Sequence, residues 1–122
     1  MRTGNFQPLA RSGDIWVEDL PNETVVYDRA TNRGHCLNAT AAQVFRLADG
    51  QRTVAQIAAA LSVGDQLDVV WLTLEELAAC GLLAEPLPQG PSLTRRALIT
   101  AGVGAALLPV IMTITASEAL AY

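Results

Sequence analysis

The side chains with potential for catalysis or metal binding are few in this sequence. It contains one histidine, His35, and two cysteines, Cys36 and Cys80. A catalytic base needs a nucleophile or an orienting acid beside it, and no triad or metal-ligand pattern surrounds His35. The cysteines form no CxxC pair, so we expect two reduced, partly buried thiols. We interpret His35 as a strand residue that faces solvent or a groove, and we predict no metal site.

An adjacent carboxylate pair, Glu75 and Glu76, lies inside a segment with helical periodicity. No basic residue stands three or four positions from either glutamate, so we expect no ion pair within this helix. We interpret the pair as a solvated helix face that could orient a bound peptide. These observations together predict a binding protein that is not an enzyme and needs no cofactor.

The charge balance argues against one large class of partner. Residues 1–92 contain six arginines and eleven acidic residues, a net charge of −5. Such a charge repels a phosphate backbone. The segment from Gln66 to Cys80 contains three acidic residues and no basic one, so a DNA-recognition helix of this sequence would be repelled from the groove. We therefore expect no nucleic-acid binding.

Three short strands are predicted in the first third of the chain. β-branched and aromatic residues cluster in short alternating runs, and turn-forming residues separate these runs. The predicted strands cover residues 15–17, 24–27 and 35–37. Because the connections are short, we expect an antiparallel meander.

Helical periodicity begins directly after the third strand. Asn38 or Thr40 can cap a first helix that ends before Gly50. Thr53 can open a second helix, with Gln56 three positions later completing a capping box. Both helices are therefore defined by residues at their ends as well as by their apolar faces.

The third predicted helix, from about Gln66 to Cys80, has a wider apolar surface than one core contact requires. Val69, Leu72 and Thr73 lie beside its main apolar stripe, and Gly81 can end it. A second apolar face on this helix is therefore available, either for a ligand or for cover by the protein's own strands.

The predicted fold class is α+β, with a three-stranded antiparallel sheet followed by three helices in a winged-helix-like arrangement, plus a C-terminal hydrophobic helix. We divide the chain into a flexible arm (1–13), a globular domain (14–85), a Pro/Gly linker (86–93) and a hydrophobic tail with an Arg-Arg start (94–122).

Three motifs at defined spacing give the domain a family resemblance. They are Leu37-Asn38 at the end of the third strand, the run Asp49-Gly50-Gln51-Arg52-Thr53-Val54 between helices, and the closing Gly81-Leu82-Leu83. In this order they resemble the PqqD family over about residues 14–85. The resemblance implies a non-catalytic chaperone that recognises the precursors of ribosomally synthesised, enzymatically modified peptides.

The resemblance also implies where the peptide binds. The leader segment of the precursor would add as an extra strand to the edge of the third strand and lie against the third helix, as an exposed strand edge permits. The implied edge residues are Gly34, His35, Cys36 and Leu37. The implied groove residues on the helix are Val69, Val70, Thr73, Leu74 and Leu77.

The implied partners are the leader peptide and a modifying enzyme, often a radical S-adenosylmethionine enzyme in such families. The alternative is an acidic winged-helix transcriptional regulator or protein-interaction module. An exposed strand edge also allows a homodimer. We expect a cytoplasmic protein, because the two cysteines do not form a disulfide framework.

The tail begins with Arg95-Arg96 and continues with twenty uncharged residues, 97–116. As a helix this stretch would be about 30 Å long, enough to anchor the protein in a membrane. The start also resembles a twin-arginine export signal, although such signals are N-terminal. Two further interpretations remain, a segment that docks on a partner and an extra helix that folds onto the domain's own groove.

Overall fold

The computed structural model describes residues 4–61, 67–90, 94–104 and 108–115, and its elements follow the order β-β-β-α-α-α-α-β. The strands are β1 (Ile15–Asp19), β2 (Thr24–Asp28), β3 (Arg33–Leu37) and β4 (Ile111–Thr115). The helices are α1 (Ala39–Leu47), α2 (Val54–Ala60), α3 (Leu67–Ala79) and α4 (Arg95–Thr100). The α+β class, the three predicted strands and the three predicted helices are thus confirmed.

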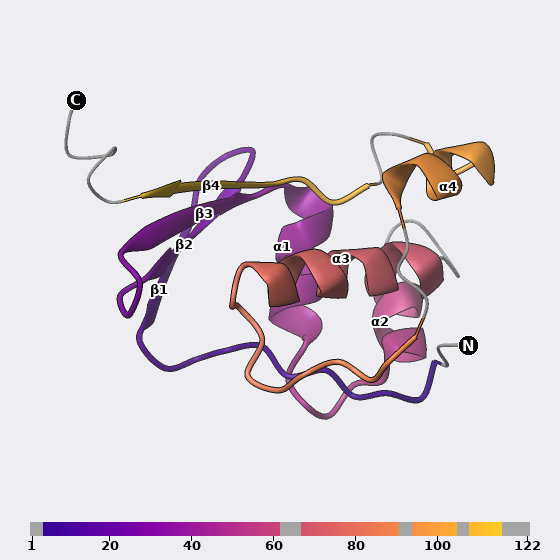
Figure 1. Cartoon of the computed structure of the whole chain (residues 1–122), viewed down its shortest axis with the longest axis horizontal. Coiled ribbons are helices and arrows are strands. Elements are labelled where there is room, and N and C mark those ends of the chain that lie inside the picture. The colour runs from indigo at the N-terminus through magenta and orange to yellow at the C-terminus, as the bar shows by residue number, and fades with distance from the viewer. Residues whose placement is uncertain (1–3, 62–66, 91–93, 105–107, 116–122) are drawn as a thin grey trace.

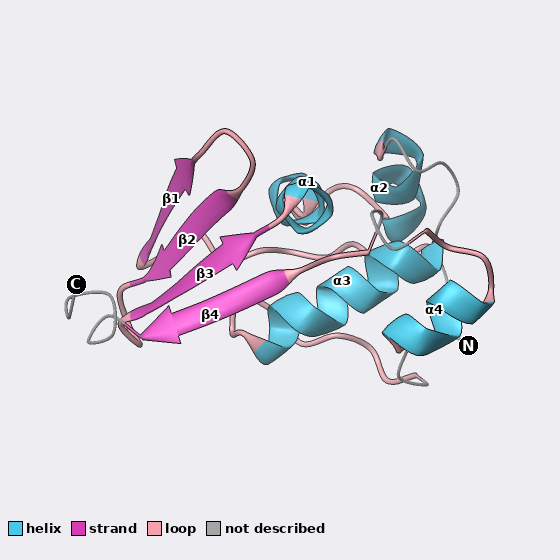
Figure 2. Cartoon of the chain, turned by 90° about the horizontal axis from the view of Figure 1, so that it is seen from above, coloured by secondary structure: helices cyan, strands magenta, loops and turns pink. Residues whose placement is uncertain are grey.

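The sheet has four antiparallel strands in the order β1-β2-β3-β4. Its fourth strand comes from the tail, which returns to pair with β3 (Figure 1). The helices gather towards one end of the sheet, and α3 lies beside the segment that leads into β4 (Figure 2). The expected winged-helix-like arrangement finds no support, since the tail extends the sheet.

The predicted helix ends are present in atomic detail. The Asn38 side chain accepts a hydrogen bond from the Ala41 N–H at 3.1 Å and so caps α1. Thr53 and Gln56 form the reciprocal capping box that opens α2. Gly81, directly after α3, has a φ of 75°, a left-handed conformation that favours glycine.

The apolar side chains form two separate clusters. The buried members of the main cluster all lie between Val26 and Leu82 and come from β2, β3, the first three helices and the short segments beside these helices. The second cluster joins two side chains of α3 to three of the tail, and its members are Val69, Leu72, Leu98, Val103 and Leu108. The tail therefore covers the second apolar face of α3.

The expectation of a C-terminal hydrophobic helix over residues 97–116 is wrong. The described part of this stretch contains the end of the six-residue helix α4, a turn at Gly102 and the strand β4. Pro109 lacks a backbone N–H and interrupts helical hydrogen bonding. None of the helices in the described ranges is both long and apolar enough to cross a membrane.

The N-terminal segment makes contacts that a loosely held arm would lack. The Phe6 ring stacks on Trp71 of α3 with 5.7 Å between ring centroids. The Arg11 guanidinium donates to the buried Asp28 carboxylate at 2.7 Å. This hydrogen bond is the main cause that lowers the pKa of Asp28. The described part of the segment is therefore fixed to the domain.

Candidate functional site at the edge of the third strand

The edge of β3 is the place where an extended segment lies against this domain. β4 pairs with β3 in antiparallel register, from Leu37 opposite Ile111 to Arg33 opposite Thr115. The paired range on β3 includes all four edge residues that the sequence pointed to, Gly34, His35, Cys36 and Leu37. Strand addition at this edge is thus physically possible, and the added strand here is the protein's own tail.

Asn38, at the junction of β3 and α1, binds the main chain of the tail just before β4. Its side-chain amide donates to the Leu108 carbonyl at 2.9 Å, and its side-chain oxygen accepts from the Val110 N–H at 3.0 Å. Its own N–H donates to the Val110 carbonyl at 3.0 Å. Since the partners of Asn38 are backbone groups, this grip does not depend on the side chains of the bound segment.

The apolar wall of the site comes from one face of α3. Val69 and Leu72 contact Leu98, Val103 and Leu108 of the tail in the second cluster. Leu108 is 3 % exposed, and its carbonyl is one of the backbone groups that Asn38 binds. Leu108 is therefore the anchor side chain of the segment that precedes β4.

The remaining groove residues suggested by the sequence have other surroundings. Val70, Leu74 and Leu77 are fully buried in the main cluster, so they support the fold beneath the site. The buried Thr73 hydroxyl donates to the Val69 carbonyl at 2.7 Å, within the helix. Of the five helix residues that the sequence suggested for the groove, Val69 is the one that belongs to the second cluster, which includes the tail.

His35 faces the core side of the sheet and is 1 % exposed. Its Nδ1 lies 2.8 Å from the Thr113 hydroxyl of β4, and its buried Nε2 has no hydrogen-bond partner among the residues that the structure describes. Burial is the main cause that lowers the pKa of His35, opposed by the nearby Asp28 carboxylate. A neutral imidazole buried beside β4 can recognise a hydroxyl on an added strand.

The two cysteines are free thiols, and both lie near β4. Cys36 is opposite Met112 in the sheet register, while the Cys80 sulfur lies 3.7 Å from the Thr113 hydroxyl. Burial, with a smaller contribution from Glu23, raises the pKa of the Cys36 thiol. A raised pKa makes a thiol less nucleophilic at neutral pH.

Arg95 of α4 fastens the tail to α3. Its guanidinium donates to both oxygens of Glu76, at 2.8 and 3.1 Å, and also to the Pro109 carbonyl. Burial raises the pKa of Glu76, and Arg95 partly offsets this increase. The sequence identified Glu76 as a carboxylate that could orient a peptide, and in the structure it pairs with the tail.

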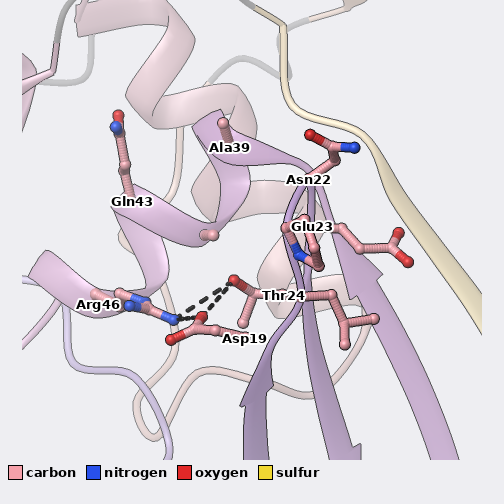
Figure 3. A pocket seen from close by; sticks show the side chains of 10 residues that line it. Asp19, Asn22, Glu23, Thr24, Ala39, Gln43 and Arg46 are labelled. Carbon is pink, nitrogen blue, oxygen red and sulfur yellow. Dashed lines mark hydrogen bonds and ion pairs between the residues drawn. The ribbon is translucent and has the colours of Figure 1, made fainter.

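A separate open pocket of about 360 Å³ lies between the β1–β2 turn and α1 (Figure 3). Arg46 contacts Asp19 there, and the Thr24 hydroxyl donates to Asp19 at 2.9 Å. These polar groups are already paired with one another. The described residues also contain no group of three histidine, cysteine or carboxylate side chains that could hold a metal ion.

Sequence reasoning missed the contributions of three residues to the site, Asn38, Arg95 and Leu72. Asn38 was identified only as a helix cap, although a residue between a strand edge and a helix start can also reach the backbone of an added strand. Arg95 was assigned to a membrane flank or an export signal. Leu72 was correctly placed on the second face of α3, but it was left out of the expected groove.

Comparison with known proteins points in the same direction as the motifs. A family model described as coenzyme PQQ synthesis protein D (PqqD) matches residues 23–69. Searches of the curated proteins and of the solved structures found no match. The matched range contains β2, β3, Asn38, α1, α2 and the first residues of α3. The match covers less than half of the chain, and it includes the edge of β3, so this part of the chain is similar to PqqD.

Proposed function

We propose that this protein binds the leader segment of a ribosomally synthesised precursor peptide and presents it to a modifying enzyme, without doing chemistry itself. The leader adds as a strand to β3, with its backbone held by Asn38 and an aliphatic side chain placed against Val69 and Leu72. The observation that carries the proposal is the seating of β4, an extended segment, at this edge.

The energetics of the site suit peptide recognition. Main-chain hydrogen bonds to a strand edge supply affinity for any extended segment, while pockets for individual side chains supply selectivity. Here the pocket for the anchor is the second face of α3, and the hydroxyl-recognising group is His35. The site residues that we propose are therefore Gly34 to Asn38, Val69 and Leu72.

A titration of the full-length isotope-labelled protein tests this function. The probe is a synthetic peptide with the leader sequence of the precursor encoded beside this gene, and a scrambled peptide of equal composition is the control. We expect amide shifts at residues 33–38 and near Val69 and Leu72. Shifts confined to the pocket near Arg46, or none with millimolar leader, would contradict strand addition.

Two matched variants of α3 sharpen the experiment. Leu72→Asp places a carboxylate in the apolar wall, whereas Ala79→Asp places one on an exposed part of the same helix. Leu72 is not part of the main cluster, so the domain core stays intact. We expect Leu72→Asp to weaken leader binding at least about tenfold and Ala79→Asp to leave it unchanged.

A further inference from the structure

The tail can leave the domain without dismantling its main core. The buried members of the main cluster lie between Val26 and Leu82, and among the described apolar residues of the tail only the half-buried Ile111 packs against them. The buried apolar contacts of Leu98, Val103 and Leu108 are instead with Val69 and Leu72. Detachment of the tail therefore exposes one face of α3 and the edge of β3, and it costs few core contacts.

The contacts of the tail are those of a bound peptide. Asn38 and β3 hold its backbone, the Leu108 side chain is deeply buried just before β4, and Thr113 presents a hydroxyl to His35. Two other apolar side chains, Val110 and Met112, stay largely exposed at 48 and 64 %. This exposure at alternate positions fits a segment that leaves one face in solvent and places its other face against the domain.

Arg95 holds the tail to α3 through contacts that lie outside β4. It connects Glu76 of α3 with the Pro109 carbonyl at the start of the extended segment. Its side chain is 41 % exposed, so water and salt weaken this ion pair. This interaction of Arg95 is thus weak enough to break, and while it is formed it holds Pro109, the residue after Leu108, in place.

We propose that the tail is an intramolecular competitor whose described parts, residues 95–104 and 108–115, occupy the leader site until an incoming peptide displaces them. This inference rests on the proposed function, and it also defines the class of peptide that can compete. Such a peptide carries an aliphatic anchor in the place of Leu108, followed by a strand-forming stretch with a hydroxyl side chain opposite His35. The apparent affinity for the leader is lowered by the fraction of molecules whose tail is closed.

The test uses the full chain and a fluorescein-labelled peptide with the sequence of residues 107–116, extended by two lysines for solubility. Binding is measured by anisotropy to the wild type, to Leu108→Asp and to Val110→Asp. Leu108→Asp loosens the internal anchor, while Val110→Asp places the same charge on an exposed tail residue. We expect Leu108→Asp to bind the peptide at least about tenfold more tightly than the other two proteins.

The outcomes separate this inference from the proposed function. Equal affinity in all three proteins means that the peptide binds without competition, which overturns the inference and leaves peptide binding intact. If Leu108→Asp gives a dispersed NMR spectrum but binds neither this peptide nor the leader, the proposed function fails as well. Arg95→Ala is the second opening variant should Leu108→Asp not fold, and it is expected to tighten binding in the same direction.

Amide hydrogen exchange on the unmodified protein gives an independent test. A displaceable tail opens more often than the domain unfolds, so amides of β4 should exchange at least about tenfold faster than those of β2. Equal protection of β2 and β4 would make β4 a permanent strand and refute the proposal. Addition of the unlabelled 107–116 peptide should speed the exchange of β4 further while β2 stays protected.

Discussion

Replacement of Asn38 by aspartate is expected to loosen β4 while it keeps the cap of α1. Aspartate retains an oxygen for the Ala41 N–H, and it is as good a helix cap as asparagine. It loses the amide donor that binds the Leu108 carbonyl at 2.9 Å and faces this carbonyl with a carboxylate oxygen. Asn38→Asp therefore separates the two roles of the residue.

The size of the effect follows from the number of hydrogen bonds changed. One lost hydrogen bond contributes about 0.5 to 1.5 kcal/mol, and the unsatisfied carbonyl beside a carboxylate raises the total to about 1 to 3 kcal/mol. This corresponds to an opening equilibrium of the tail that rises by about 5- to 150-fold. Asn38→Ala removes the cap as well, which costs about 1 kcal/mol more in the stability of α1.

Native-state amide exchange followed by NMR measures the opening of the tail and the stability of α1 in one experiment. In Asn38→Asp and Asn38→Ala alike, amides of β4 should lose protection by the amount given above. Amides of α1 should lose clearly more protection in Asn38→Ala than in Asn38→Asp. If Asn38→Asp leaves the exchange of β4 unchanged, then the hydrogen bond from the Asn38 amide to the Leu108 carbonyl does not hold the tail, and this part of the proposed binding of a peptide backbone is refuted.

Three further predictions concern stability and access to the site. Arg11→Ala leaves the Asp28 carboxylate buried without its guanidinium, and urea unfolding should show a loss of about 3 kcal/mol; a loss below 0.5 kcal/mol would mean that water replaces the arginine. The pKa of His35 is lowered in the folded protein, so unfolding binds a proton below about pH 6.5 and stability should fall as the pH drops through 6.5. His35→Gln should remove this part of the pH dependence. If the variant's free energy of unfolding changes with pH as steeply as that of the wild type, a buried neutral imidazole at position 35 is contradicted. Arg95→Ala should speed alkylation of Cys36 and Cys80 by iodoacetamide, since both thiols lie beside β4, and unchanged rates in single-cysteine variants would contradict opening at this edge.

The local elements could be predicted because their signals lie within a few residues. Asn38 caps a helix through an N–H three positions later, and Thr53 and Gln56 satisfy each other across one turn. Such hydrogen bonds depend on spacing alone, so the sequence contains them in full. The strands before them are likewise separated by short turns.

The α3 residues that pack against the tail were predicted only in part, because α3 has two apolar faces. Val70, Leu74 and Leu77 follow the spacing of one helix face, and this face packs on the main cluster. Val69 and Leu72 lie one and two positions away from that stripe and form the second face. Periodicity shows that α3 has two apolar faces, but it does not show which of them a ligand reaches.

The tail was misjudged because hydropathy does not identify the partner of an apolar segment. Twenty uncharged residues satisfy the length of a membrane helix, yet Pro109 and the β-branched residues around Ile111 favour an extended chain. The partner strand of β4 is β3, which lies more than seventy residues earlier in the chain, and a local sequence pattern does not predict pairing over such a separation. The backbone of β3 accepts any extended chain, so selectivity between the tail and a leader has to come from the anchor against α3 and from the hydroxyl beside His35. A leader whose side chains fit these two positions better than Leu108 and Thr113 would displace the tail from β3. A leader whose side chains fit them worse would leave β4 paired with β3.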